Sequence, residues 1–341
     1  MASSRRPTLT DVAKRVGVSA KTVSRVLNED GPVSAATRDR VREAVAELGF
    51  QPNLMARNMR VGARDSTVGL VVPEIGNPFF GSVAGGVESA LGDRGLTLLL
   101  GSSDESVTKE RALVAAFLAR RVSALMVVPA TGGDHRALRK ERGSGLPVVF
   151  VDRPGAGITA DAVVSANLEG ARRGVAHLIA GGHRRVAFVG DRPASLYTRK
   201  QRFRGYRQAL DEAGLPLDRS LVADAHTPDA AGRAVRRLLS GGDPPTAVFT
   251  ANNFASQGVM EALSEDGVRD RVAMVGFDDM PLADLVRPGL TVIAQDPRQV
   301  GVEAARIALA RLDGDRAAAA TTTVPVRLLP RGSGELPGPG R

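Results

Sequence analysis

Residues 8–28 read TLTDVAKRVGVSAKTVSRVLN, and their pattern predicts the fold of the N-terminal part of the chain. It contains two short segments with apolar residues at helical spacing, separated only by Gly17-Val18-Ser19. We expect Thr10 to cap the first helix, Gly17 to end it and Ser19 to cap the second. A tight glycine turn between two short helices is the signature of a helix-turn-helix unit. The apolar positions of the two helices are Val12, Ala13, Val16, Val23, Val26 and Leu27.

A helix-turn-helix unit places the N-terminal end of its second helix in the major groove of DNA. The outward residues of that helix combine short side chains, which allow close approach, with two long cations. They are Ala20, Lys21, Thr22, Ser24, Arg25 and Asn28. A third helix follows, which Ser34 caps and Gly49 ends. Its apolar face carries Val41, Val45 and Leu48.

Positive charge is concentrated at this end of the chain. Residues 1–66 carry 12 Lys/Arg and 7 Asp/Glu, a net charge of +5, whereas the whole chain of 341 residues has a net charge of +9. A basic end segment is typical of a protein that binds the phosphate backbone of nucleic acid, and a solvated basic tail would have the same composition.

The composition excludes several classes of protein. The chain contains no cysteine, which rules out disulfides, thiolate metal sites and thiol catalysis. Residues 1–7 are polar and basic and lack the apolar segment of a signal peptide, and no apolar run approaches the roughly 18 residues of a membrane span. No Walker loop, dinucleotide-binding glycine motif or nucleophile elbow is present, and the four histidines lack metal-ligand spacing. We therefore expect a soluble cytoplasmic protein without a membrane partner, enzyme activity, catalytic residues, metal or cofactor.

From residue 67 onward, short apolar runs alternate with helical patterns. Most runs are continuous rather than alternating, which is typical of strands buried on both faces of a parallel sheet. Strand–helix alternation predicts a doubly wound α/β fold, and ten strands favour two similar subdomains with a cleft between them. The predicted strands are 68–72, 96–100, 124–128, 148–151, 163–165, 186–189, 221–223, 247–250, 272–275 and 290–294.

Several segments of the first sixty residues resemble the headpiece of the LacI/GalR family of repressors. They are TLTDVA at 8–13, VSAKTVSRVLN at 18–28, Val33-Ser34, Thr37-Arg38 and GFQPN at 49–53. The resemblance implies a homodimer with two headpieces on a palindromic double-stranded DNA operator. It also implies hinge helices that insert a leucine into the central base step, where this chain has Met59, which is also an apolar side chain. The DNA-binding residues expected on this basis are Thr8, Ser19, Ala20, Lys21, Thr22, Ser24, Arg25, Asn28, Asn53, Ala56 and Met59.

The resemblance also implies a core like that of periplasmic sugar-binding proteins, with an effector site at the carboxyl ends of its strands. Where the family commonly has Asn-Asp, this chain has Asn252-Asn253. Phe79, Phe80, Tyr197 and Phe254 are the candidates for an apolar wall. Arginine donates through a planar fork while aspartate and asparagine accept hydrogen bonds, so the polar residues suit a sugar or another polar ring. The expected effector-binding residues are Asn77, Phe79, Asp152, Arg202, Asn252, Asp278 and Gln295.

The expected fold is therefore a small all-α helix-turn-helix headpiece followed by an α/β, periplasmic-binding-protein-like core of two doubly wound parallel-sheet subdomains. The expected boundaries are 1–50 for the headpiece, 51–66 for a hinge helix and linker, and 67–331 for the effector-binding and dimerisation core. The first lobe covers about 67–164 and 297–323, and the second about 165–294 and 324–331. Residues 332–341 are rich in glycine and proline and lack leucine heptads, which predicts a flexible tail and no tetramerising coiled coil.

These features predict a sequence-specific transcriptional repressor controlled by a small polar effector such as a sugar. The alternatives are a sugar-binding receptor, an enzyme that acts on a sugar, and a DNA-binding regulator that responds to a phosphorylated protein partner. One ligand that touched Asp152 in the first lobe and Arg202 in the second would fix the relative orientation of the lobes. We therefore expect Arg202→Ala to remove the effector response and Met59→Gly to remove regulated operator binding.

Overall fold

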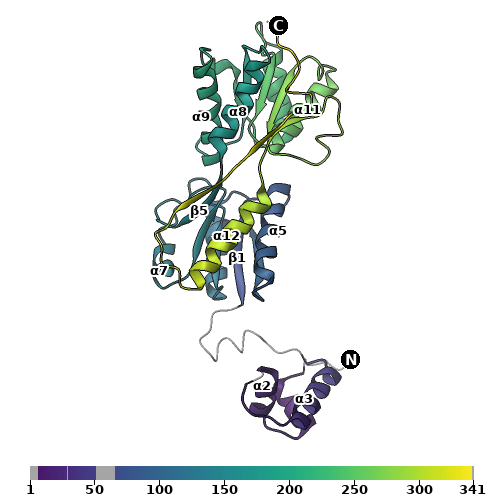
Figure 1. Ribbon diagram of the computed structural model, residues 1–341, viewed down its shortest axis with the longest axis vertical. Coiled ribbons are helices and arrows are strands. Elements are labelled where there is room, and N and C mark those ends of the chain that lie inside the picture. The colour runs from purple at the N-terminus through teal and green to yellow at the C-terminus, as the bar shows by residue number, and fades with distance from the viewer. Residues whose placement is uncertain (1–6, 29, 51–65, 340–341) are drawn as a thin grey trace. The chain divides into compact units, whose positions relative to one another are not determined.

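The chain divides into two compact units, Met1–Asp65 and Ser66–Arg341. A computed structural model describes residues 7–28, 30–50 and 66–339 of them. The first unit contains three helices, α1 Leu9–Val16, α2 Ala20–Asn28 and α3 Ala35–Leu48 (Figure 1). Its core is formed by the buried side chains of Val12, Ala13, Val16, Val23, Val26, Val41, Ala44 and Phe50. The predicted helix-turn-helix headpiece is confirmed.

The turn between α1 and α2 forms as the sequence predicts. Gly17 has a φ of 73°, and its amide donates to the carbonyl of Ala13 at 3.0 Å. Glycine adopts this left-handed conformation without the steric cost that a side chain would add. Ser19 Oγ accepts a hydrogen bond from the amide of Thr22 at 3.1 Å and so caps the start of α2.

The N-terminal caps of α3 and α1 are Ser34 and Thr8. Ser34 Oγ accepts from the amide of Thr37 at 3.3 Å, so the predicted cap of α3 is confirmed. The prediction that Thr10 caps α1 is wrong, because the cap is Thr8. The carboxylate of Asp11 accepts from both the amide of Thr8, at 2.8 Å, and its hydroxyl, at 2.6 Å. The helix therefore starts at Leu9, before Thr10.

The first lobe of the second unit is built on a six-stranded parallel sheet with the strand order β11-β5-β4-β3-β1-β2. Its strands are β1 Thr67–Val72, β2 Thr97–Ser102, β3 Ala124–Val127, β4 Val148–Val151, β5 Asp161–Ser165 and β11 Thr321–Val324. Helices α5 Pro78–Gly92 and α12 Pro297–Leu312 cover one face, and α6 Val107–Ala119 and α7 Leu138–Gly143 cover the other (Figure 1).

The second lobe repeats this design with the strand order β12-β10-β9-β8-β6-β7, in which β12 is antiparallel to β10. Its strands are β6 Val186–Gly190, β7 Val222–Asp224, β8 Ala247–Thr250, β9 Ala273–Phe277, β10 Thr291–Ala294 and β12 Arg327–Leu329. Helices α8 Asn167–Ala180 and α9 Tyr197–Glu212 cover one face, α10 Pro228–Leu239 and α11 Asn253–Glu265 the other, and a short 3-10 helix, η1 Arg219–Leu221, precedes β7.

The chain passes between the two lobes three times, after β5, after β10 and after β11 (Figure 1). The predicted α/β core of two doubly wound subdomains is confirmed, and all ten predicted strands are present. The two further strands, β11 and β12, were not predicted. They are short, and most of their residues are exposed or half-buried, so they lack the continuous apolar run that identified the others.

The end of the chain departs from the flexible tail expected over residues 332–341. The described part of this segment, residues 332–339, packs against the second lobe. Ser333 is buried, its Oγ donates to the carbonyl of Met274 at 2.6 Å, and the same Oγ accepts from the amide of Thr291 at 2.9 Å. Glu335 accepts a hydrogen bond from the hydroxyl of Thr291 at 2.7 Å. These contacts hold in place a segment whose composition alone predicted flexibility.

Candidate functional site

Helix α2 presents one polar face and one buried face. Ala20, Lys21 and Arg25 are exposed, whereas Val23 and Val26 are buried in the headpiece core. The side chains that were predicted to read DNA therefore lie on the face that does not pack against the rest of the headpiece. A short exposed residue beside two long cations is a surface that the major groove can accept.

Other predicted DNA-contact residues also have structural roles. The hydroxyl oxygens of Ser19 and Thr22 are 2.9 Å apart and share a hydrogen bond at the start of α2. Thr8 is engaged with Asp11 in the cap of α1, and Ser24 is half-buried. The side chain of Asn28 and the whole of Asn53, Ala56 and Met59 lie outside the described part of the chain, as does the predicted hinge helix.

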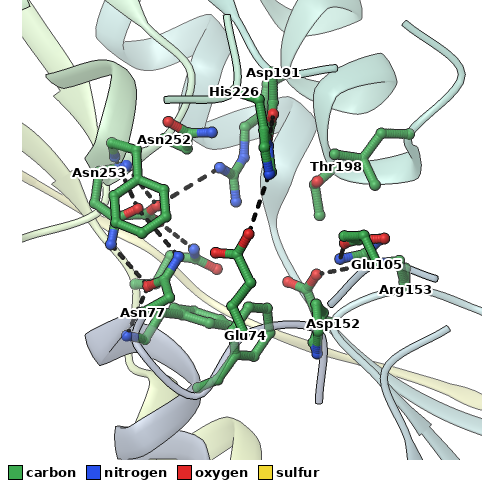
Figure 2. Close-up of a pocket in the computed structure, with 18 residues that line it drawn as sticks. Glu74, Asn77, Glu105, Asp152, Arg153, Asp191, Thr198, His226, Asn252 and Asn253 are labelled. Atoms are coloured by element: carbon green, nitrogen blue, oxygen red, sulfur yellow. Dashed lines mark hydrogen bonds and ion pairs between the residues drawn. The ribbon is translucent and has the colours of Figure 1, made fainter. Parts of the chain in front are cut away.

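A cavity lies between the two lobes of the second unit, at the carboxyl ends of their parallel strands (Figure 2). Its empty volume is about 510 Å³, part of which is open to solvent. All seven residues predicted to bind an effector line this cavity: Asn77, Phe79, Asp152, Arg202, Asn252, Asp278 and Gln295.

Two aspartates occupy equivalent positions in the two lobes. Asp152 follows β4 and Asp278 follows β9, with φ values of 66° and 79°. The amide of Asp152 donates to the carbonyl of Val163 at 2.8 Å, and that of Asp278 donates to Ile293 at 3.0 Å, each on the next strand. Left-handed backbone is rare for residues other than glycine and is often found at functional sites. This conformation turns each carboxylate toward the cavity at only 5% and 7% exposure.

Arg202 on α9 is held in one orientation by the second lobe. It is 4% exposed. Its Nε donates to Asn167 Oδ1 at 2.7 Å, and its Nη1 donates to the carbonyl of Ala251 at 2.6 Å. The guanidinium lies 3.8 Å from Asp278 Oδ2 and 3.8 Å from the centre of the Phe277 ring. A cation fixed in this way is preorganised to bind a polar ligand.

A second arginine completes the first-lobe wall. Arg153 Nη2 lies 2.7 Å from Glu105 Oε1, and its Nε lies 3.4 Å from Asp152 Oδ2. Burial raises the pKa of Asp152, and the positive charges of Arg153 and Arg202 act in the opposite direction. On this wall, the carboxyl groups of Asp152 and Glu105 share one neighbouring cation, Arg153.

Amide side chains meet across the cleft. Asn253 Nδ2 donates to Asn77 Oδ1 at 2.8 Å, and Asn77 Nδ2 faces Asn253 Oδ1 at 3.4 Å (Figure 2). Asn77 also caps α5 through the amide of Phe79, and Asn252 caps α11 through the amide of Ala255 at 2.7 Å. The amide of Asn253, at a position where the family commonly has aspartate, donates the hydrogen bond that Asn77 Oδ1 accepts.

His226 lies between two carboxylates that belong to different lobes (Figure 2). Its Nδ1 is 2.9 Å from Oδ1 of Asp191, which follows β6, and its Nε2 is 3.1 Å from Oε1 of Glu74, which follows β1. Hydrogen bonds to Asp191 and Glu74 raise the pKa of His226 to about 10. The imidazole is therefore protonated at neutral pH.

Gln295 and the phenylalanines complete the cavity. The Gln295 amide donates to Asp278 Oδ1, and its Oε1 is buried with no hydrogen-bond partner within the described residues. Phe79, Phe80 and Phe254 line the cavity as expected, whereas Tyr197 is not part of its lining.

Several polar lining residues were not predicted. They are Glu74, Glu105, Arg153, Asp191, Thr198, His226 and Asn253. Most of them follow a strand of a parallel sheet, so a search of every strand end for polar residues would have found them. No group of three or more His, Asp or Glu suited to a metal ion occurs in residues 7–28, 30–50 and 66–339. In the same residues, no helix is long and apolar enough to cross a membrane.

The fold and the cavity define a helix-turn-helix DNA-binding protein with a two-lobed ligand-binding domain. Comparisons agree with this class. Residues 8–53 match the family described as bacterial regulatory proteins, lacI family, and residues 175–334 match a periplasmic binding protein-like domain. The chain is 31% identical over 335 residues to the HTH-type transcriptional regulator DegA of Bacillus subtilis, covering 96% of this chain and 98% of DegA. This chain therefore belongs to the LacI family of transcriptional regulators.

Solved structures show the same organisation. The complex of the transcriptional regulator CelR with cellobiose has a TM-score of 0.71 and 31% sequence identity, and the match covers 96% of this chain and all of that one. The Lac repressor dimer bound to operator and the anti-inducer ONPF has a TM-score of 0.83 and 27% identity, with 97% and 99% of the two chains covered. The protein is thus a DNA-binding transcriptional regulator.

Proposed function

We propose that this regulator is a homodimeric repressor that acts in the cytoplasm. Each headpiece inserts α2 into one half of a palindromic operator. The exposed Lys21, Arg25 and Ala20 on α2 support this role, because arginine and lysine donate to guanine and alanine contacts the methyl group of thymine. A dimer with two-fold symmetry reads two inverted half-sites about one helical turn apart.

The effector is a small polyhydroxylated molecule such as a sugar, bound between the lobes. The observation that carries this proposal is the convergence of Asp152, Asp278 and Arg202 on one cavity from both lobes. Carboxylates accept hydrogen bonds from ligand hydroxyls, a fixed guanidinium donates to ligand oxygens, and Gln295 Oε1 is a further acceptor. Phe79 and Phe254 supply apolar surface for the ring. The related CelR binds cellobiose, which supports a ligand of this class.

The charge of the cavity narrows the choice of ligand. Five carboxylates and three cations line it, and each cation lies within 4 Å of a carboxylate: Arg153 with Glu105 and Asp152, Arg202 with Asp278, and His226 with Asp191 and Glu74. A phosphate or carboxylate on the ligand would meet an excess of negative charge. We therefore expect the effector to be uncharged or cationic rather than phosphorylated.

A thermal-shift screen against sugars, their phosphate esters, amino sugars and nucleosides tests the effector. A ligand present at 100 times its Kd stabilises the folded protein by about 2.7 kcal/mol. We expect a neutral or amino sugar to raise the melting temperature and the matching phosphate ester to have no effect. Stabilisation by the phosphate ester alone would contradict the assignment.

Operator binding is tested separately, with DNA that carries two inverted half-sites. We expect full affinity on the pair and much weaker binding on a single half-site. Met59→Gly is expected to weaken operator binding and to remove its response to effector, while effector binding itself stays intact. Full affinity on one half-site would contradict binding as a homodimer. Wild-type regulation in Met59→Gly would contradict a role of this position in the hinge.

A further inference from the structure

Two sets of side-chain contacts connect the lobes directly across the cavity. One is the amide pair of Asn77 and Asn253, at 2.8 and 3.4 Å. The other is the contact of His226 with Glu74, at 3.1 Å, which continues to Asp191 at 2.9 Å. The first is a pair of neutral hydrogen bonds, whereas the second places one cation between two anions. Charge-assisted hydrogen bonds are roughly twice as strong as neutral ones.

The surroundings of His226 favour its charged form. Glu74 from the first lobe and Asp191 from the second are the charged groups that face its ring, one at each nitrogen. The side chain of His226 is 43% exposed, and those of Glu74 and Asp191 are 27% and 19% exposed. Water and salt therefore weaken the bridge.

We propose that His226 is a positioning residue of the cavity: its imidazolium joins Asp191 of its own lobe to Glu74 of the other and sets how far the lobes open in the absence of effector. The bridge itself is argued from the contacts of His226, and only its influence on effector binding rests on the proposed function. A ligand that enters the cavity competes with the bridge, so the bridge also sets how much of the ligand's binding free energy is needed to change the lobe angle.

A second histidine provides a matched control. His177 Nε2 lies 2.5 Å from Glu335 Oε1, with side chains 25% and 34% exposed, so it too is a partly exposed histidine in contact with a carboxylate. Both partners belong to the second lobe, where His177 lies on α8. Removal of His177 should affect the second lobe locally and leave the distance between the lobes unchanged.

The distance between the lobes can be measured with spin labels, since the chain contains no cysteine. Lys140→Cys on α7 of the first lobe and Arg204→Cys on α9 of the second are exposed positions for the two labels. Double electron–electron resonance then gives the distance distribution, with labelled chains diluted into unlabelled chains so that labels in a partner do not contribute. The measurement uses the full-length protein without added sugar.

We expect His226→Leu and Glu74→Gln each to add a second, open distance population, with the closed-to-open ratio reduced about three- to tenfold. His226→Lys, which keeps a cation between the carboxylates, should retain the wild-type distribution, and so should His177→Leu. A wild-type distribution in His226→Leu would overturn the proposal. So would an open population in His226→Lys, because the position and not the charge would then matter.

Failure of the bridge and failure of the proposed function give different results. The lobe distances do not depend on DNA or on the identity of the effector. Operator binding is measured by fluorescence anisotropy on the same variants. Wild-type lobe distances in His226→Leu together with regulated operator binding would overturn the bridge alone. An opened cleft in a protein that binds no operator would leave the bridge standing and contradict the proposed function.

Discussion

Replacement of Arg202 by alanine should affect both the stability of the core and the affinity for effector. Arg202 neutralises Asp278 at 3.8 Å and satisfies Asn167 Oδ1 and the carbonyl of Ala251. Its removal would leave a buried carboxylate without its cation, which typically costs about 3–5 kcal/mol. We expect the lower end of that range, about 3 kcal/mol, because Asp278 still accepts hydrogen bonds from the amide of Asn253 and from Gln295.

Stability and ligand binding must be separated in this test, and a neighbouring arginine allows it. Arg199 lies on the same helix, is 8% exposed and forms two hydrogen bonds of 3.0 Å with Asp224, but it does not line the cavity. Arg199→Ala should therefore also destabilise the core, by less than Arg202→Ala because Asp224 is 26% exposed, and it should leave effector affinity unchanged.

Urea unfolding followed by circular dichroism measures the stability of both variants, and calorimetric titration measures their effector affinity. In Arg202→Ala, the loss of charged hydrogen bonds to the ligand should weaken binding by roughly 10–100-fold, equivalent to about 1.5–3 kcal/mol. Operator affinity without effector should stay close to that of the wild type. If Arg202→Ala binds effector as tightly as the wild type, or no more weakly than Arg199→Ala, the role of Arg202 in the cavity is wrong.

Three further predictions concern the headpiece and His226. Operator affinity should fall by about 10³–10⁵ between 50 and 200 mM salt if the dimer contacts roughly 6–10 phosphates, and a flat salt dependence in anisotropy titrations would contradict DNA binding through the phosphate backbone. Exchanging the residues Ala20 and Lys21 should change which operator is preferred in a binding selection, whereas equal weakening on all sequences would make Lys21 a phosphate contact. The pKa of His226 is raised from 6.5 to about 10, so its bridge should stabilise the core fully below about pH 6.5 and lose this effect as the pH rises toward 10. Between pH 7 and about 10, the free energy of unfolding measured with urea should fall more steeply with pH in the wild type than in His226→Leu. Equal slopes in the two proteins would show that the pKa of His226 is not raised.

The fold could be predicted largely because its strands are buried on both faces. Continuous apolar runs such as 148–151 mark such strands, and the helix-turn-helix unit carries its own signals in Gly17 and Ser19. The terminal strands β11 and β12 carry no such signal. Residues 332–339 are ordered by contacts with β9 and β10, which no local pattern encodes.

The site could be predicted only in part, since the sequence indicates which residues follow strands but not which of them meet. Asp152 and Asp278 follow the predicted strands 148–151 and 272–275, and the family resemblance marked them as effector residues. Their left-handed backbone is consistent with a turn toward the cavity. The cross-lobe partners of His226 and Asn253 depend on how the two lobes face each other. That arrangement is set by the three chain crossings and cannot be read from spacing.

We expect the headpiece and the cavity to be coupled, and thermodynamic linkage measures that coupling. The sugar that stabilises the protein in the screen is titrated by calorimetry into the protein alone and into its complex with operator DNA. Operator affinity is then measured by anisotropy with and without that sugar. We predict that each ligand changes the affinity of the other by the same factor, about 5–150-fold. Equal sugar affinity in the presence and absence of operator would contradict the coupling.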